Sequence, residues 1–375
     1  MEGAPLETLI KAQAFGLGFD LAGITTLGPA ETAAAFDDWL ARGFEGEMGY
    51  MSRTAEKRRD SRLPLDGMRT AVVVAMSYGG DQPSGPVARY ARGDDYHDVM
   101  WDRLNALLRW ISEQRGGAVN GKAYVDTGPL LERDLARRAG LGWFGKNTTL
   151  IDPRGGSFFF LGALLLDLEL AADAPFATDH CGTCRRCLDA CPTNALVDAH
   201  VLDATKCISY LTIELKGDIP DAMRPLIGEL LYGCDICQEV CPFNRKFARE
   251  LSEPAFAMRP ALAGKDSRTL ALELLGMSQS EFSAAFKGSP MKRAKRRGLR
   301  RNAAVVLGNV GEIGDVPPLV AALSDDEPLV RGHAAWALGA IASPEALEAL
   351  RARRSVEPEA SVQSEIASAL ARAGA

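Results

Sequence analysis

The chain lacks the sequence features that direct a protein out of the cell or into a bilayer. Residues 1–5 do not show the basic segment followed by an apolar segment that makes a signal peptide. The uncharged run at residues 155–166 is too short to cross a bilayer. With 375 residues, 47% hydrophobic and 25% charged, the sequence is typical of a soluble protein of two or three domains. We therefore expect a cytoplasmic protein.

Two common phosphate-binding motifs are also missing. No G-x-G-x-x-G follows the first expected strand, and no glycine-rich loop ends in the lysine of an ATP site. The sequence therefore gives no support for a nicotinamide or ATP site. The net charge of −6 argues against a general affinity for nucleic acid.

Cysteine, in contrast, is concentrated in one stretch. All eight cysteines lie between residues 181 and 241, as Cys-x2-Cys-x2-Cys-x3-Cys-Pro and Cys-x2-Cys-x3-Cys-Pro, with Cys207 between the two groups. Bacterial ferredoxins hold [4Fe–4S] clusters with the first spacing, and its fourth cysteine binds the other cluster. Leu231 stands where the second group would have a third thiolate, and Cys207 can fill that gap. This crossed pattern assigns one cluster to Cys181, Cys184, Cys187 and Cys241, and the second cluster to Cys191, Cys207, Cys234 and Cys237.

Zinc and disulfides are the alternatives for these thiols. Zinc sites also use Cys-x2-Cys pairs, but three cysteines at this spacing give one more thiolate per loop than a zinc ribbon uses. A cytoplasmic location favours thiolates over disulfides. Two adjacent clusters form a one-electron relay, so the spacing predicts a protein that moves electrons.

Apolar patterns predict an α/β domain over residues 1–170. Helices are expected at residues 6–17, 31–40, 98–114 and 130–139, and strands at 19–25, 71–76, 122–125 and 158–170. The β-branched run at 71–76 is typical of a strand buried on both faces. Helices that alternate with strands over this length indicate the α/β class.

Three further segments are expected after this domain. They are a ferredoxin-type domain at residues 171–250, opened by a linker, a helical connector at 251–290 and a helical repeat at 291–375. The repeat is visible as R-x2-A-A-x2-L-G, which begins at Arg300 and again at Arg331, with a fainter copy at 362–370. Short paired helices at this period indicate a small HEAT-like solenoid, a fold that binds macromolecules along a concave face.

A strongly basic run begins the repeat. Residues 291–301 read MKRAKRRGLRR, with seven cations and no acid. Such a run can be a solvated helix face or a site for an acidic protein. In an acidic chain, such a run favours binding to the phosphate backbone of a nucleic acid. It would position that backbone without recognising the base sequence. We therefore expect a structured RNA to contact Lys292, Arg293, Lys295, Arg296, Arg297, Arg300 and Arg301.

Polar motifs recur in the expected loops of the α/β domain. They are RGDDYH at 92–97, DTGP at 126–129, ERD at 132–134 and GKNT at 145–148. Each alone is typical of turns and helix caps, and Asp134 can pair with Arg138 one helical turn later. In combination with GLGWFGKN at 140–147, CISYLT at 207–212 and GCDICQ at 233–238, they resemble the epoxyqueuosine reductase family over roughly residues 10–345.

The resemblance implies a cobalamin-dependent iron–sulfur enzyme related to reductive dehalogenases, with a nitroreductase-like α/β domain that binds cobalamin. The enzyme would reduce epoxyqueuosine to queuosine at the wobble position of tRNA, the final step of queuosine synthesis. An external low-potential donor, a flavodoxin or ferredoxin, would supply the electrons. The family's catalytic acid falls on Asp134. Positions matched to the cobalamin surroundings are Tyr96, His97, Asp134, Ser157, Phe158, Ser209 and Asp235.

The histidines bear on how such a cofactor would be held. Cobalamin proteins that replace the lower base with histidine use an Asp-x-His-x-x-Gly motif, and neither His97 nor His200 is followed by that glycine. We therefore expect cobalamin without a histidine axial ligand. A cobalt that lacks a strong lower ligand is easier to reduce to Co(I), because that ion prefers few ligands.

Other classes of protein fit part of the pattern. A different cobalamin and iron–sulfur reductase, such as a reductive dehalogenase, would usually carry an export signal. A ferredoxin-like electron carrier would show iron without corrin absorbance. A pure interaction scaffold would have no use for cysteines at cluster spacing.

Overall fold

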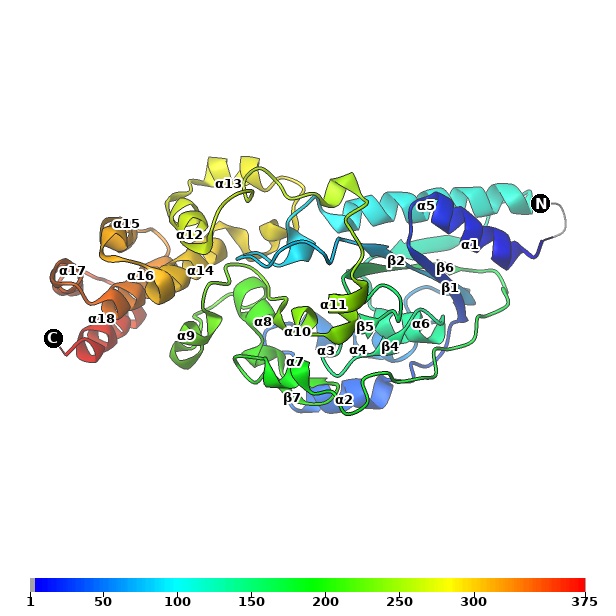
Figure 1. Cartoon of the computed structure of the whole chain (residues 1–375), viewed down its shortest axis with the longest axis horizontal. Helices are drawn as coiled ribbons and strands as arrows, with labels where there is room; N and C mark the ends of the chain where they lie inside the picture. The colour runs from blue at the N-terminus through cyan, green and yellow to red at the C-terminus, as the bar shows by residue number, and fades with distance from the viewer. Residues whose placement is uncertain (1–3, 375) are drawn as a thin grey trace. The chain divides into compact units, whose positions relative to one another are not determined.

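The computed structural model describes residues 4–374 and divides the chain into two compact units (Figure 1). The first, unit 1, contains Met1–Pro83, Gly93–Ala204 and Asp235–Ala257, and the second, unit 2, contains Ser84–Arg92, Thr205–Cys234 and Met258–Ala375. The four segments expected from the sequence divide the chain along its length, whereas these units divide it in space. The segment boundaries therefore stay predictions. Within residues 4–374, no helix combines the length and the apolar character that crossing a membrane requires.

A four-stranded sheet forms the centre of unit 1. Its order is β1 (Leu21–Thr26), β2 (Thr70–Ser77), β6 (Phe159–Leu166) and β3 (Gly121–Tyr124). All three pairings are antiparallel, so the alternation of helices and strands does not build parallel β-α-β units here. β2 is buried along its whole length, as its apolar run predicted.

Helices cover both faces of this sheet, which explains the burial of β2 (Figure 1). The helices are α1 (Leu6–Gly16) and α5 (Tyr96–Arg115) on one face, and α6 (Glu132–Arg138) on the other. Gly162 of β6 leaves room for α5, because a Cβ at this position would lie 3.0 Å from Leu104 and 3.1 Å from Met100. On the opposite face, Leu135 of α6 packs against Val73 and Ala163.

Shorter elements complete unit 1. They are α2 (Ala33–Ala41), α3 (Tyr50–Arg53), α4 (Ala55–Arg59), α7 (Arg186–Asp189), α10 (Ile236–Glu239), α11 (Pro242–Phe247), the hairpin of β4 (Trp143–Phe144) with β5 (Leu150–Ile151), and the hairpin of β7 (Leu196–Asp198) with β8 (Val201–Leu202). The sequence did not predict the two hairpins, because strands of two or three residues are too short to show a period. The cysteine motifs lie in loops and single helical turns.

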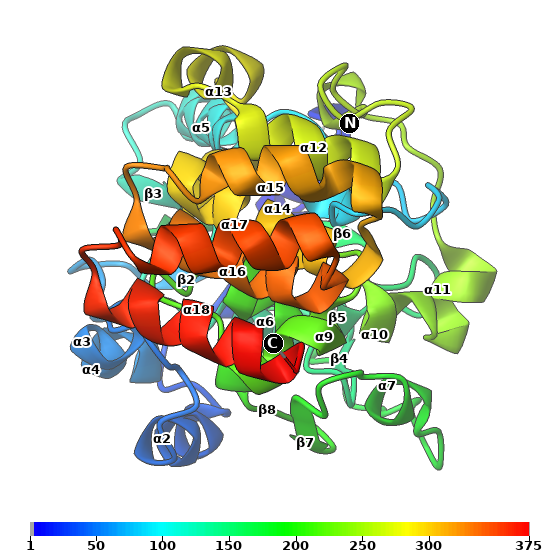
Figure 2. The same cartoon turned by 90° about the vertical axis from the view of Figure 1, so that its left-hand side faces the viewer.

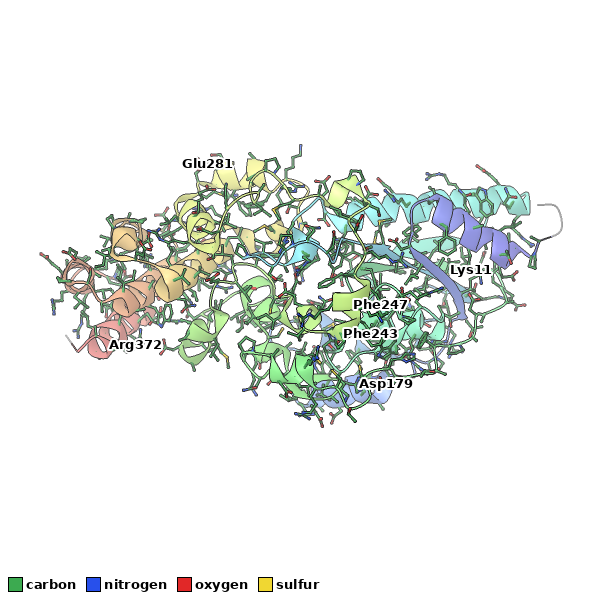
Figure 3. All side chains as sticks on the ribbon, viewed as in Figure 1. Lys11, Asp179, Phe243, Phe247, Glu281 and Arg372 are labelled. Carbon is green, nitrogen blue, oxygen red and sulfur yellow. The ribbon has the colours of Figure 1, made fainter. Side chains whose placement is uncertain are left out.

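The segment that leads into the first cysteine motif also borders β1. Asp173 donates its backbone N–H to the carbonyl of Ile24 at 2.8 Å and accepts the N–H of Ile24 on its carboxylate, also at 2.8 Å. Lys11 of α1, labelled in Figure 3, places its Nζ 2.6 Å from the same carboxylate. The sequence indicated only a linker at residues 171–180, whereas in the structure Asp173 of this stretch bonds to Ile24 of the edge strand β1.

Unit 2 contains the predicted helical repeat (Figure 2). Its helix pairs are α12 (Ser267–Gly276) with α14 (Lys295–Val310), α15 (Val316–Ala322) with α16 (Pro328–Ile341), and α17 (Pro344–Arg354) with α18 (Ala360–Arg372). The repeated glycines lie where successive helices touch. A Cβ on Gly308 would lie 2.3 Å from the ring of Trp336, and one on Gly339 would lie 2.6 Å from Ala369. The repeating motif therefore encodes close helix packing, and the HEAT-like prediction is confirmed.

The remaining helices of unit 2 are α8 (Ile208–Ile213), α9 (Arg224–Ile227) and α13 (Gln279–Ala285). α13 begins with a capping box, in which Ser278 and Glu281 each bond the other's backbone N–H.

Candidate iron–sulfur and proton-transfer site

The four cysteines assigned to the first cluster all lie in unit 1 and influence one another. Cys241 is buried in a small apolar cluster with Trp143 and Ile151, and Cys181 packs against this cluster. Burial raises the pKa of the Cys187 and Cys241 thiols, and the charge of Cys181 raises both further. Cys184 acts in the same way on Cys241. Cys181 therefore lies close enough to Cys187 and Cys241 to influence both thiols, and the assignment of the four cysteines to one cluster stays a prediction.

The second set of cysteines is divided between the units. Cys191 and Cys237 belong to unit 1, and Cys207 and Cys234 belong to unit 2. Burial would raise the pKa of the Cys191 thiol, but hydrogen bonds from Thr193 and from backbone N–H groups outweigh burial and lower it. Such donors favour the thiolate, the form that binds iron. The assignment of this set stays a prediction. Among residues 4–374, no three His, Cys, Asp or Glu side chains are arranged to hold a single metal ion.

A group of ionisable side chains gathers at the start of α5. The Tyr96 hydroxyl donates to Asp126 Oδ2 at 3.0 Å, and its ring stacks on Phe160 with centroids 4.1 Å apart. His97 Nδ1 lies 2.6 Å from Asp95 Oδ1, and its Nε2 lies 3.6 Å from Asp126 Oδ2. Asp126 has a left-handed backbone (φ 57°), which is unusual for aspartate, and its side chain is 66% exposed.

Glu132 completes this group, which we call the Asp126 cluster: Tyr96, His97, Asp126 and Glu132. Its Oε1 accepts the backbone N–H of Asp126 at 2.7 Å. Burial, followed by the charge of Asp126, raises the pKa of Glu132 to about 8. Burial alone would lower the pKa of His97, but Asp126 and Asp95 outweigh it and raise the pKa to about 9. At neutral pH, Glu132 and His97 therefore both hold a proton beside an exposed carboxyl group.

Asp134, the predicted acid, has different surroundings. It is only 1% exposed, inside α6. Its Oδ1 accepts the N–H of Thr32 at 3.0 Å and the Thr32 hydroxyl at 3.1 Å, and its Oδ2 accepts from Arg138 Nη1 at 3.5 Å. These contacts fasten α6 to the segment before α2, and the pair with Arg138 is the alternative that the sequence offered.

The other positions matched to the cobalamin surroundings lie in several elements. Ser157 is buried, donates its N–H to Asn244 Oδ1 at 2.6 Å and its hydroxyl to Gln238 Oε1 at 2.9 Å. It therefore ties the start of β6 to α10 and α11. The rest are Phe158, buried before β6, Asp235, buried at the N-terminus of α10, and Ser209, half-buried on α8 of unit 2.

The basic run is only partly open to a partner. Lys292, Arg293 and Lys295 are exposed, and Arg296 and Arg297 are half-buried. Arg293 forms a two-pronged ion pair with Glu214, with both N–O distances 2.9 Å. The remaining half-buried cation is Arg300, which pairs with Asp325 and donates to the carbonyl of Leu275 at 2.7 Å.

Arg301 is fully buried, so the prediction that it contacts nucleic acid is wrong. Its guanidinium donates to the carbonyls of Leu211 at 2.7 Å, Leu215 at 2.7 Å and Gly217 at 2.8 Å. These bonds fasten the α8 region to α14 and satisfy a buried charge with backbone acceptors. A helix turns one side of a charge run inward, and composition alone does not show which side.

The sequence analysis quoted Asp126 and Glu132 within motifs but did not name them as candidate site residues, and the role of Asp134 stays a prediction. The available signal was position. Asp126 follows a buried strand within a loop, where functional residues gather, whereas Asp134 falls inside a helix.

Three family descriptions match parts of the chain. "4Fe-4S double cluster binding domain" matches residues 180–244, which include all eight cysteines. "Epoxyqueuosine reductase QueG, DUF1730" matches residues 58–127, and "HEAT repeats" matches residues 291–371.

Named proteins match over almost the whole length. The epoxyqueuosine reductase of Xanthomonas campestris pv. campestris is 44% identical over 341 residues, which are 88% of this chain and 94% of that protein. A crystal structure of epoxyqueuosine reductase with an epoxyqueuosine-modified tRNA-Tyr stem loop is 32% identical, with a TM-score of 0.88 and 99% of each chain covered. The Bacillus subtilis enzyme, with its aspartate-bearing catalytic loop swung out of the active site, is 31% identical, with a TM-score of 0.87 and 98% of each chain covered.

Proposed function

The chain belongs to the epoxyqueuosine reductase family, and from that premise we propose how its own residues carry out the reaction. It is an oxidoreductase that reduces epoxyqueuosine in tRNA to queuosine. The observation that carries this conclusion is 44% identity over nearly the full length of a named relative, joined to eight cysteines inside a double-cluster match. The reaction is a deoxygenation: the epoxide takes up two electrons and two protons, both C–O bonds break, and an alkene and water result.

Two [4Fe–4S] clusters and cobalamin are the cofactors. We propose the crossed ligand sets, Cys181, Cys184, Cys187 and Cys241 for one cluster and Cys191, Cys207, Cys234 and Cys237 for the other. Cobalamin, when bound, would supply a strongly reducing cobalt centre.

The Asp126 cluster fits a place beside cobalamin. His97 Nε2 is buried and has no hydrogen-bond partner within the described residues, so it is ready to donate to a bound group. Despite partial burial, Asp126 and Asp95 raise the pKa of His97 to about 9, so in our proposal His97 would donate a hydrogen bond to the corrin. We propose that Tyr96, His97, Ser157, Phe158, Ser209 and Asp235 line the corrin.

The same cluster supplies the proton for the departing oxygen in our proposal. Asp126 is exposed, and the Tyr96 hydroxyl and its bond to Glu132 hold it in place. Glu132 and His97 keep protons at neutral pH, so in this proposal the proton starts on one of them and passes through the Asp126 carboxylate to the departing oxygen. Asp126 lies on a loop between β3 and α6, whereas Asp134 lies within α6. Asp134 stays the alternative donor.

A direct assay tests the function. Anaerobically purified protein, supplied with cobalamin and a low-potential reductant, is expected to convert epoxyqueuosine in tRNA to a nucleoside lighter by one oxygen, as measured by mass spectrometry. The visible spectrum reports iron–sulfur and corrin absorbance in the same sample. If the protein carries both cofactors but leaves the nucleoside unchanged, the assignment fails.

We propose that the exposed cations of the basic run contact the tRNA backbone. Support comes from their exposure and from the relative solved with a tRNA stem loop. Arg300, half-buried and paired with Asp325, contributes less, and the exposed Arg293 would exchange its ion pair with Glu214 for a phosphate. A flavodoxin or ferredoxin as electron donor and a cytoplasmic location belong to the same proposal, because tRNA maturation requires both substrate and low-potential electrons inside the cell.

Reversing three of these charges should weaken tRNA binding. The triple variant Lys292→Glu, Arg293→Glu, Lys295→Glu is expected to lose roughly 10- to 100-fold in affinity at about 0.1 M salt, with a shallower salt dependence, because fewer counterions are released. Binding titrations at several salt concentrations measure both effects. A matched control reverses Arg53, Lys57 and Lys122, which are exposed cations of unit 1. Equal losses in the two variants would contradict a specific patch.

A further inference from the structure

The turn at residues 145–147 contacts both groups of cysteine ligands within unit 1. Lys146 Nζ donates to the carbonyl of Gly182 at 2.6 Å and to that of Cys184 at 3.0 Å. Asn147 Nδ2 donates to the carbonyl of Cys237 at 3.3 Å. The sequence singled out this Gly-Lys-Asn motif without a role, and neither the proton transfer nor the tRNA contact uses it.

The surrounding bonds hold the turn in one conformation. It joins β4 to β5, and Gly145 donates its N–H to the carbonyl of Thr149 at 2.8 Å. The buried Asn147 accepts the Thr149 hydroxyl at 2.8 Å, and His200 donates its N–H to the carbonyl of Lys146 at 3.0 Å. A half-buried ammonium group is therefore fixed against the loop between Cys181 and Cys184, where water screens it only in part.

A fixed cation changes the reduction of a neighbouring cluster. A [4Fe–4S] core with four thiolates is anionic, and reduction adds one further negative charge. A positive charge therefore stabilises the reduced form more than the oxidised form. The Trp143 ring N–H, 3.5 Å from Cys181 Sγ, acts in the same direction as a donor to a ligand sulfur.

We propose that Lys146 sets the reduction potential of the cluster held by Cys181, Cys184, Cys187 and Cys241. Its charge raises that potential, so the cluster is easier to reduce and accepts electrons readily from the donor. Lys146 is thus a tuning residue that acts through the cluster. The inference rests on the proposed function only in that these four cysteines hold a cluster.

The test is a redox titration of anaerobically purified, cluster-loaded protein, followed by electron paramagnetic resonance. Lys146→Gln keeps N–H donors for the two carbonyls but removes the charge, and Lys146→Arg keeps the charge. In Lys146→Gln, the ratio of reduced to oxidised cluster at a given potential is expected to fall about tenfold for one of the two clusters. Its midpoint potential then becomes more negative by about 59 mV, the value for a one-electron couple. The other midpoint, the Lys146→Arg variant and the control Lys122→Gln on β3 should stay at wild-type values.

Three results would overturn the proposal. Two of them are unchanged midpoint potentials in Lys146→Gln and equal shifts in Lys146→Gln and Lys146→Arg. The third is loss of cluster iron from Lys146→Gln, because the residue would then stabilise the cluster-binding loop and not tune the potential. The titration needs neither tRNA nor cobalamin. A protein that shows the shift but does not convert epoxyqueuosine would therefore refute the proposed function and leave this inference intact.

Discussion

Asp126→Asn should lower the turnover of epoxyqueuosine-modified tRNA by about 100-fold or more, the usual contribution of a positioned acid. Asparagine keeps the size of the side chain and can still accept the Tyr96 hydroxyl, but its amide cannot take up a proton from His97 or Glu132 and pass it on. Asp134→Asn should retain activity within a few-fold, because that carboxylate is buried against Thr32 and Arg138. Single-turnover rates at saturating tRNA measure both variants.

Two controls accompany this pair. Both variants should keep wild-type iron content and corrin absorbance, so that loss of activity reports chemistry. Asp134→Asn should unfold at a lower temperature, because it weakens a charged hydrogen bond in a buried site. The opposite pattern, an active Asp126→Asn and an inactive Asp134→Asn, would return the acid to the position that the sequence predicted.

Cys207→Ala should remove or degrade one cluster and abolish turnover. In the crossed pattern Cys207 is the single ligand that stands outside both motifs, and no other thiol can replace it because the chain has eight. Iron per chain is expected to fall from the eight atoms of two cubes to between four and seven, depending on whether a three-iron remnant survives. Iron analysis and electron paramagnetic resonance measure the change.

Cys181→Ala is the matched variant. It should affect the other cluster and keep the electron paramagnetic resonance signal that Cys207→Ala loses. A Cys207→Ala protein with full iron and full activity would refute the crossed assignment. Zinc in place of iron in the wild-type protein would refute the clusters altogether.

The sequence predicted best those features that depend on neighbouring residues. Cysteine spacing is local, so the cluster motifs were visible at once, and the apolar run of β2 and the repeated glycines of the solenoid were visible for the same reason. The antiparallel order of the sheet was not, because β2 pairs with β6, some 90 residues away. Strand order depends on such distant pairings, which periodicity does not encode.

Within the candidate site, the sequence could not distinguish residues of the same chemical type. Asp126, Glu132 and Asp134 lie within nine residues and are all carboxylic acids. The sequence does not distinguish their roles, so our proposal for Asp126 and Glu132 depends on burial and hydrogen-bond partners, and the catalytic role of Asp134 stays a prediction. Lys295 and Arg301 differ for the same reason, since one belongs to the exposed side of the run and the other to its buried side.

The contact between Asp173 and β1 joins two properties that are usually separate. An unprotected edge strand can pair with a strand of another molecule, which is a common route to aggregation. Here Asp173 bonds to the edge strand at Ile24, and the chain continues from Asp173 to Cys181, a proposed cluster ligand, eight residues later. A change in the loop of Cys181 that displaced Asp173 would therefore also expose the edge of β1 at Ile24.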